Sequence, residues 1–97
     1  MGEAEEHERN RGIDRTVSLK VMYFASARDI VGKREELLSI GDAMNVGELA
    51  VRLQEIHPRL GGLGKSARYA LNLEIVDGDT ALHEGDEVAV LPAVTGG

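Results

Sequence analysis

The chain has 97 residues, a formal net charge of −6, and neither cysteine nor tryptophan. This length fits one domain with a small aliphatic core, and the missing cysteines exclude disulfides, cysteine-based metal sites and thiol nucleophiles. The negative charge argues against nucleic acid and anionic membranes as partners and favours a protein with a basic face. With no secretory signal and no apolar run long enough to cross a bilayer, we expect a cytoplasmic protein.

Residues 1–16 contain five acidic residues and three arginines, with almost no apolar side chains. Such a stretch cannot bury enough surface to offset the entropy that it loses on ordering. We therefore expect a disordered extension over residues 1–16, a folded domain over residues 17–91, and a flexible tail over residues 92–97.

The first elements of the domain read as a hairpin. Residues 17–25 alternate with a period of two and are rich in β-branched and aromatic side chains, which predicts a strand. A helical turn is expected over residues 26–31, before Gly32. Residues 34–40 then predict an antiparallel return strand.

A helix follows the hairpin. Asn45 and Glu48 have the three-residue spacing of a helix capping box, and Pro58 marks the end of the helix. Apolar residues recur between them at spacings of three or four, which places them on one helix face. These residues are Val46, Leu49, Ala50, Leu53 and Ile56.

The second half of the chain predicts a glycine-rich surface loop near residues 61–64, one strand over residues 69–76, and a last strand over residues 87–91. The order strand, strand, helix, strand, strand is typical of an α+β domain in which a sheet packs on one main helix. A last strand beside the first gives a mixed sheet in a β-grasp arrangement.

Two motifs lack the context that their usual function requires. Residues 61–66 resemble the end of a phosphate-binding loop, but Arg59 stands where the pattern needs glycine, and a helix rather than a strand precedes it. The histidines at positions 7, 57 and 83 form no recognisable metal or acid–base constellation. We therefore expect no catalytic site, no metal and no permanently bound cofactor.

The most informative feature is the pair Gly96-Gly97. Pro92 fixes its own φ and biases Leu91 toward an extended conformation, so the tail leaves the domain in a defined direction. Two residues without side chains can carry a terminal carboxylate through a slot too narrow for any other pair. A frayed end is the alternative, but the pattern suits a carboxylate that is itself the reactive group.

Five segments of the chain, taken in order, carry a family resemblance: residues 21–28 (VMYFASAR), 46–49 (VGEL), 70–72 (ALN), 84–89 (EGDEVA) and 91–97 (LPAVTGG). On these segments, the chain from about Val17 onward resembles the small, sulfur-carrier subunit of molybdopterin synthase. It departs from that family at Ala93, where a second proline is common, and in its N-terminal extension.

The resemblance implies a ubiquitin-like β-grasp fold and a role as the non-catalytic sulfur donor of a heterotetrameric molybdopterin synthase. An E1-like enzyme would use ATP and magnesium to adenylate the Gly97 carboxylate, and a persulfide would then convert it to a thiocarboxylate. This sulfur would form the dithiolene of molybdopterin, on a large subunit whose active site admits the tail.

By position, the resemblance also assigns residues that bind partners. Gly97 would carry the sulfur, and Gly96 would allow the tail to thread. Phe24, Ile75 and Leu91 would dock on the large subunit, and Arg28 would pair with an acid of the partner. The alternatives are ordinary core positions for the three apolar residues and a solvated surface position for Arg28. The remaining partner-binding residues are Pro92, Val94 and Thr95.

Two other functions stay open. A sulfur carrier for thiazole or amino-acid biosynthesis would use the same Gly-Gly chemistry with a different recipient. A ubiquitin-like modifier would instead end as an isopeptide on a lysine of a target protein.

Overall fold

The computed structural model describes residues 15–92, without the side chains of residues 64–66. Most of the expected extension over residues 1–16 lies outside this range, and so do Ala93, Val94, Thr95, Gly96 and Gly97. The elements in chain order are β1 (Thr16–Tyr23), α2 (Ala25–Val31), β2 (Glu35–Gly41), α3 (Val46–Ile56), the 3-10 helix η1 (Pro58–Ser66), β3 (Arg68–Leu71), β4 (Glu74–Val76) and β5 (Glu87–Leu91).

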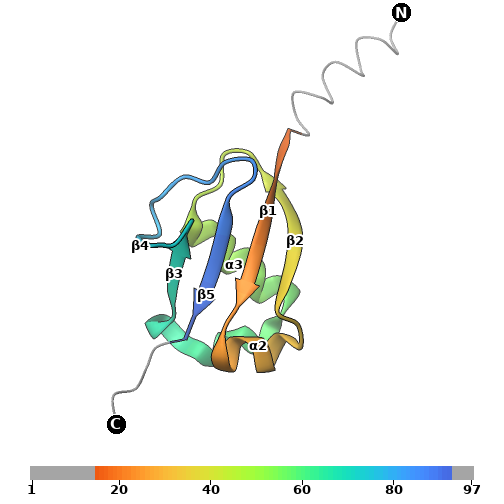
Figure 1. The fold of residues 1–97 in the computed structure, drawn as a ribbon, viewed down its shortest axis with the longest axis vertical. Helices are drawn as coiled ribbons and strands as arrows, with labels where there is room; N and C mark the ends of the chain where they lie inside the picture. Colours follow the sequence, from red (N-terminus) through yellow and green to blue (C-terminus); the bar gives the residue numbers. More distant parts are fainter. Residues whose placement is uncertain (1–14, 93–97) are drawn as a thin grey trace, which may run out of the picture.

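The strands form one mixed sheet in the order β2-β1-β5-β3-β4. The last strand, β5, runs parallel to β1 in its centre, and the other neighbours are antiparallel. The helix α3 crosses one face of the sheet, and α2 lies at the end where β1 and β5 finish (Figure 1). This arrangement confirms the expected α+β, β-grasp fold with the last strand beside the first.

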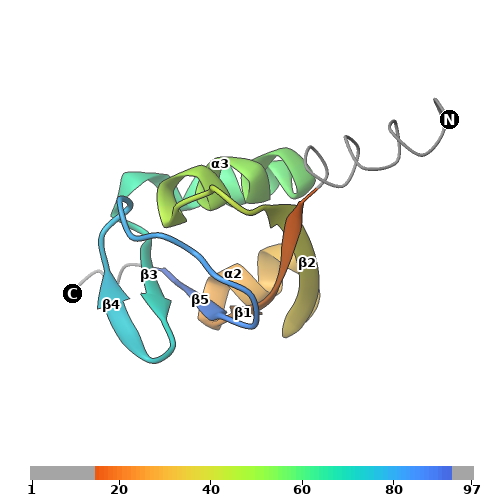
Figure 2. The same ribbon diagram turned by 90° about the horizontal axis from the view of Figure 1, so that it is seen from above.

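The core fills the space between the sheet and α3, which Figure 2 shows as two layers. Alternate residues of the central strands point into it, because successive side chains of a strand face opposite sides. The buried core residues are Leu19, Val21, Tyr23, Ala27, Ile40, Val46, Leu49, Leu53, Leu60, Leu82, Val88 and Val90. Among residues 15–92, no helix is long and apolar enough to cross a membrane.

The expected capping box of α3 is confirmed. The Asn45 side chain accepts a hydrogen bond from the Glu48 backbone N–H at 2.8 Å, and Glu48 Oε1 accepts one from the Asn45 N–H at 3.0 Å. These two bonds satisfy backbone donors that the first helical turn leaves unpaired. Three residues of the predicted apolar face are buried: Val46, Leu49 and Leu53. Ala50 is half-buried, and Ile56 in the last turn is 37% exposed.

Three local predictions were wrong. The first strand ends at Tyr23, and Ala25 already belongs to α2. The single strand expected over residues 69–76 is two strands, β3 and β4, joined by a tight turn at Asn72 and Leu73. The glycine-rich segment is not an open loop but part of η1, whose Leu60 is buried in the core.

Candidate functional site

The face of the sheet opposite α3 carries an apolar patch beside charged residues, since Lys20, Glu35 and Glu87 lie on the same face. Its central row runs across four strands, since Met22 pairs with Ala89, Ala89 with Ala70, and Ala70 with Ile75. Both alanines are nearly buried, yet they lie outside the core cluster beneath α3. Phe24 and Leu91 continue the same face toward the end of β1 and β5. We call this set the apolar face; it comprises Met22, Phe24, Ala70, Ile75, Ala89 and Leu91.

Phe24 stands where β1 passes into α2. It caps α2 with an extended backbone, its N–H donates to the Val90 carbonyl at 3.3 Å, and its side chain makes no capping bond. The positive φ of 51° at Ala25 turns the chain sharply after it. The Phe24 residue is 46% exposed and borders a hollow of about 200 Å³ that Arg28, Arg34 and Glu35 also line.

The root of the tail lies beside Phe24. Because β5 is parallel to β1, both strands finish at the same end of the sheet, and the Phe24–Val90 hydrogen bond joins them there. Leu91 pairs with Arg68 of β3, and both Leu91 and Pro92 are half-buried. Leu91 is on the opposite face from the buried Val90, so it belongs to the apolar face and not to the core.

Ile75 lies at the far edge of the apolar face, on the edge strand β4, and is 56% exposed. The structure therefore brings Phe24 and Leu91 together at the root of the tail and puts Ile75 on the same face, across the sheet. Val94, Thr95, Gly96 and Gly97, the other predicted partner-binding and reactive residues, lie outside the described range.

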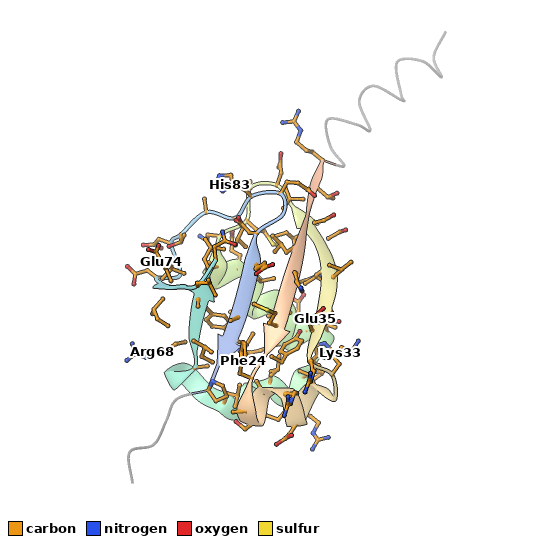
Figure 3. The ribbon with its side chains drawn as sticks, in the orientation of Figure 1. Phe24, Lys33, Glu35, Arg68, Glu74 and His83 are labelled. Carbon is orange, nitrogen blue, oxygen red and sulfur yellow. The ribbon has the colours of Figure 1, made fainter. Side chains whose placement is uncertain are left out.

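Cationic side chains gather around the tail root despite the net negative charge. Figure 3 shows Phe24 between Arg68 on one side and Lys33 and Glu35 on the other, with Glu74 and His83 farther from the tail. Arg28 is exposed on α2, and no ion pair joins it to an acid within residues 15–92. Arg28 is therefore accessible for an ion pair with an acidic group of a partner protein.

A polar cluster that the sequence did not predict lies under the same end of the sheet. The Tyr23 hydroxyl donates to Glu36 Oε2 at 2.5 Å, His57 Nε2 lies 2.7 Å from the same oxygen, and Lys33 Nζ lies 3.4 Å from Glu36 Oε1. The Tyr23 and His57 rings also meet edge to face at 5.9 Å. The cluster ties β1 and β2 to the end of α3 and so supports the strand that presents Phe24.

These contacts shift two ionisation equilibria. Burial alone would raise the pKa of Glu36, but hydrogen bonds from Tyr23 and His57, with the charges of His57 and Lys33, lower that pKa below its ordinary value. Burial first, and then the Glu36 carboxylate, raise the pKa of the Tyr23 phenol. The Glu36 carboxylate is therefore charged and the Tyr23 phenol neutral near pH 7.

The glycine-rich segment does not have the structural context of a phosphate-binding loop. Residues 61–66 lie within η1 after a helix, which is not the strand–loop–helix context of a phosphate loop. Within residues 15–92, no group of three or more histidine and acidic side chains is placed to hold a metal ion.

Known proteins resemble this chain over most of its length. The molybdopterin synthase sulfur carrier subunit of Chlamydomonas reinhardtii is 36% identical over 83 residues, which cover 84% of this chain and 100% of that protein. The solution structure of the small archaeal modifier protein 1 from Methanosarcina acetivorans matches with a TM-score of 0.70 and 27% identity over 86% of this chain and 99% of that one.

A complex of subunits 1 and 2 of the molybdopterin-converting factor from Helicobacter pylori also matches, with a TM-score of 0.61 and 27% identity over 84% of this chain and 100% of the matched chain. A ubiquitin from Caldiarchaeum subterraneum, 12% identical, shares the fold with a TM-score of 0.59 over 86% of this chain and all of its own. The fold is therefore ubiquitin-like. The model of the ThiS family matches residues 21–97, and the chain belongs to that family.

Proposed function

We propose that this protein is the sulfur-carrier subunit of a molybdopterin synthase. It holds sulfur as a thiocarboxylate on Gly97 and donates it for the dithiolene of molybdopterin. The observation that carries the proposal is the apolar face, which reaches the root of a tail ending in Gly96-Gly97. Two findings support it: the family match extends through Gly97, and a relative that matches over its full length is named for this role.

The chemistry requires a partner for activation. A carboxylate is a poor electrophile, so an E1-like enzyme with ATP and magnesium must first join a Gly97 oxygen to the α-phosphorus, releasing pyrophosphate. A persulfide sulfur then attacks the acyl carbon and AMP leaves. Reduction of the resulting acyl disulfide by a thiol releases the thiocarboxylate. The chain itself supplies the carrier group, and we propose that it works in the cytoplasm, where ATP and thiols are available.

The second partner is the large subunit of the synthase. We propose that Phe24, Ile75 and Leu91 dock on it, while Pro92, Val94, Thr95 and Gly96 lead Gly97 into its active site. Arg28 pairs with an acid near the entrance. The Helicobacter pylori complex supports a large subunit as partner, since it is described as a complex of both subunits of the molybdopterin-converting factor.

Mass spectrometry tests the proposal directly. After incubation with an E1-like enzyme, Mg-ATP and a persulfide source, the protein should gain about 16 Da, as one oxygen is replaced by sulfur. Adding one residue after Gly97, or deleting Gly97, moves the carboxylate by roughly 3.5 Å and should abolish the gain without unfolding the domain. An unchanged mass for the native chain, under conditions that charge a known carrier, would contradict sulfur transfer.

A protein modifier is the second candidate. It is favoured by the likeness to the small archaeal modifier protein 1 of Methanosarcina acetivorans, which covers 99% of that chain. A stable isopeptide between Gly97 and a lysine of another protein, formed with ATP and the E1-like enzyme, would support this function. Transfer of the thiocarboxylate sulfur to a molybdopterin precursor, with no isopeptide formed, would support the sulfur carrier.

A further inference from the structure

The turn between β3 and β4 has a backbone that does not suit its second residue. Asn72 and Leu73 form the two-residue connection, with φ values of 49° and 78°. A hairpin turn with positive φ at both positions is of type I′ and strongly prefers the pair Asn-Gly. Asn72 fits this preference. Leu73 stands where glycine is expected, and a bulky residue with positive φ is strained.

The turn does not need Leu73 for its own stability. Asn72 holds it, because its side chain donates to Asp86 Oδ1 at 3.0 Å and accepts from the Glu87 N–H at 2.9 Å, while its own N–H donates to the Glu87 carbonyl at 2.8 Å. Leu73 is 90% exposed, more than any other large apolar residue in the part of the chain that the structure describes. No burial within the domain offsets its strain.

The position of the turn suggests what Leu73 does. Figure 2 shows the β3–β4 turn projecting on the side of the sheet away from α3, which is the side of the apolar face. Ile75, two residues later, belongs to that face. Asn72 comes four residues after Arg68, whose partner Leu91 lies at the tail root, so the turn begins roughly 13 Å from this pair at about 3.3 Å per residue.

We propose that Leu73 is a projecting anchor that inserts into an apolar pocket of the synthase large subunit. This inference rests on the proposed function and extends its docking surface. Phe24 and Leu91 hold the sheet at the tail root, and Leu73 holds it at the opposite rim. Two attachments that far apart fix the rotation of the sheet on the partner, and thereby the direction in which the tail enters.

The test uses Leu73→Gly and Leu73→Asn, both compatible with positive φ, and Val51→Ala as the matched control. Val51 is also exposed, at 60%, but lies on α3, on the other side of the sheet. Thermal unfolding of the isolated carrier and calorimetric binding to the large subunit from the same organism are measured for each. We expect both Leu73 variants to unfold no lower than wild type and to bind roughly 10-fold more weakly. Val51→Ala should bind like wild type.

Several outcomes would overturn this inference. If the Kd values of Leu73→Gly and Leu73→Asn lie within about 2-fold of wild type, which is the order of the measurement error, Leu73 is not an anchor. A clear loss of thermal stability in both would show that Leu73 serves the fold. Self-association of wild type that the variants lose, seen by ultracentrifugation, would assign Leu73 to contacts between copies.

The failure of the proposed function looks different. If wild type gains no sulfur and does not bind the large subunit, the carrier role and the anchor both fall. If wild type gains sulfur and binds, while the Leu73 variants bind equally well, only the anchor falls.

Discussion

Truncating Phe24 should weaken docking on the large subunit by a calculable amount. A phenylalanine presents roughly 200 Å² of surface, and with 46% of it exposed, about 90 Å² is available for burial by a partner. At about 25 cal/mol per Å², this area corresponds to roughly 2 kcal/mol. Phe24→Ala should therefore raise the Kd about 30-fold.

The loss should appear in binding and hardly in folding. The Phe24 side chain makes no capping bond to α2, and its backbone N–H, which donates to the Val90 carbonyl, is kept in the variant. Titration calorimetry against the large subunit gives the affinity, and thermal unfolding of the isolated carrier checks the fold. Ile75→Ala, across the same face, should also weaken binding.

The apolar face is not the docking surface if Phe24→Ala and Ile75→Ala both fold and both change the Kd by less than about 3-fold. Equal losses for these variants and for Val51→Ala, which lies on α3, would show a general effect on the domain instead of a local contact.

Three further predictions concern stability. Glu36→Gln should make thermal stability less dependent on pH in the acid range. The pKa of Glu36 is lowered in the folded protein, so its carboxylate stabilises the fold above pH 4.5, the ordinary pKa, and this stabilisation is lost as the pH falls through the folded pKa. Wild type should thus lose more stability than the variant on acidification, and parallel pH curves would contradict this. Asn45→Ala removes a capping bond of α3 and should cost about 1 kcal/mol in urea unfolding, whereas no loss would mean that the cap is dispensable. Deleting residues 1–14 should leave the melting temperature and binding unchanged, and a drop of several degrees, on the order of 1 kcal/mol, would show that they pack on the domain.

The sequence alone determined the features that depend on near neighbours. The capping box joins Asn45 to Glu48 three residues away, and the period of two in β1 separates the buried Val21 from the outward Met22. The resemblance through Gly97 pointed to the family, which the family model confirms. Such signals are visible in a linear chain because their physical causes lie within one turn of helix or two residues of strand.

Only the tertiary structure decided the rest. The turn at Asn72 and Leu73 lacks the glycine that marks a type I′ hairpin, and it forms because Asn72 bonds to Asp86 and Glu87, fourteen and fifteen residues away. The bond between Glu36 and His57 joins residues twenty-one apart, which meet because β2 and the end of α3 pack together. No local sequence pattern predicts contacts between residues so far apart along the chain. The last strand was predicted to lie beside the first, but the register of this pair is set by the packing of the whole sheet. It places Val90 opposite Tyr23, and so the root of the tail next to Phe24.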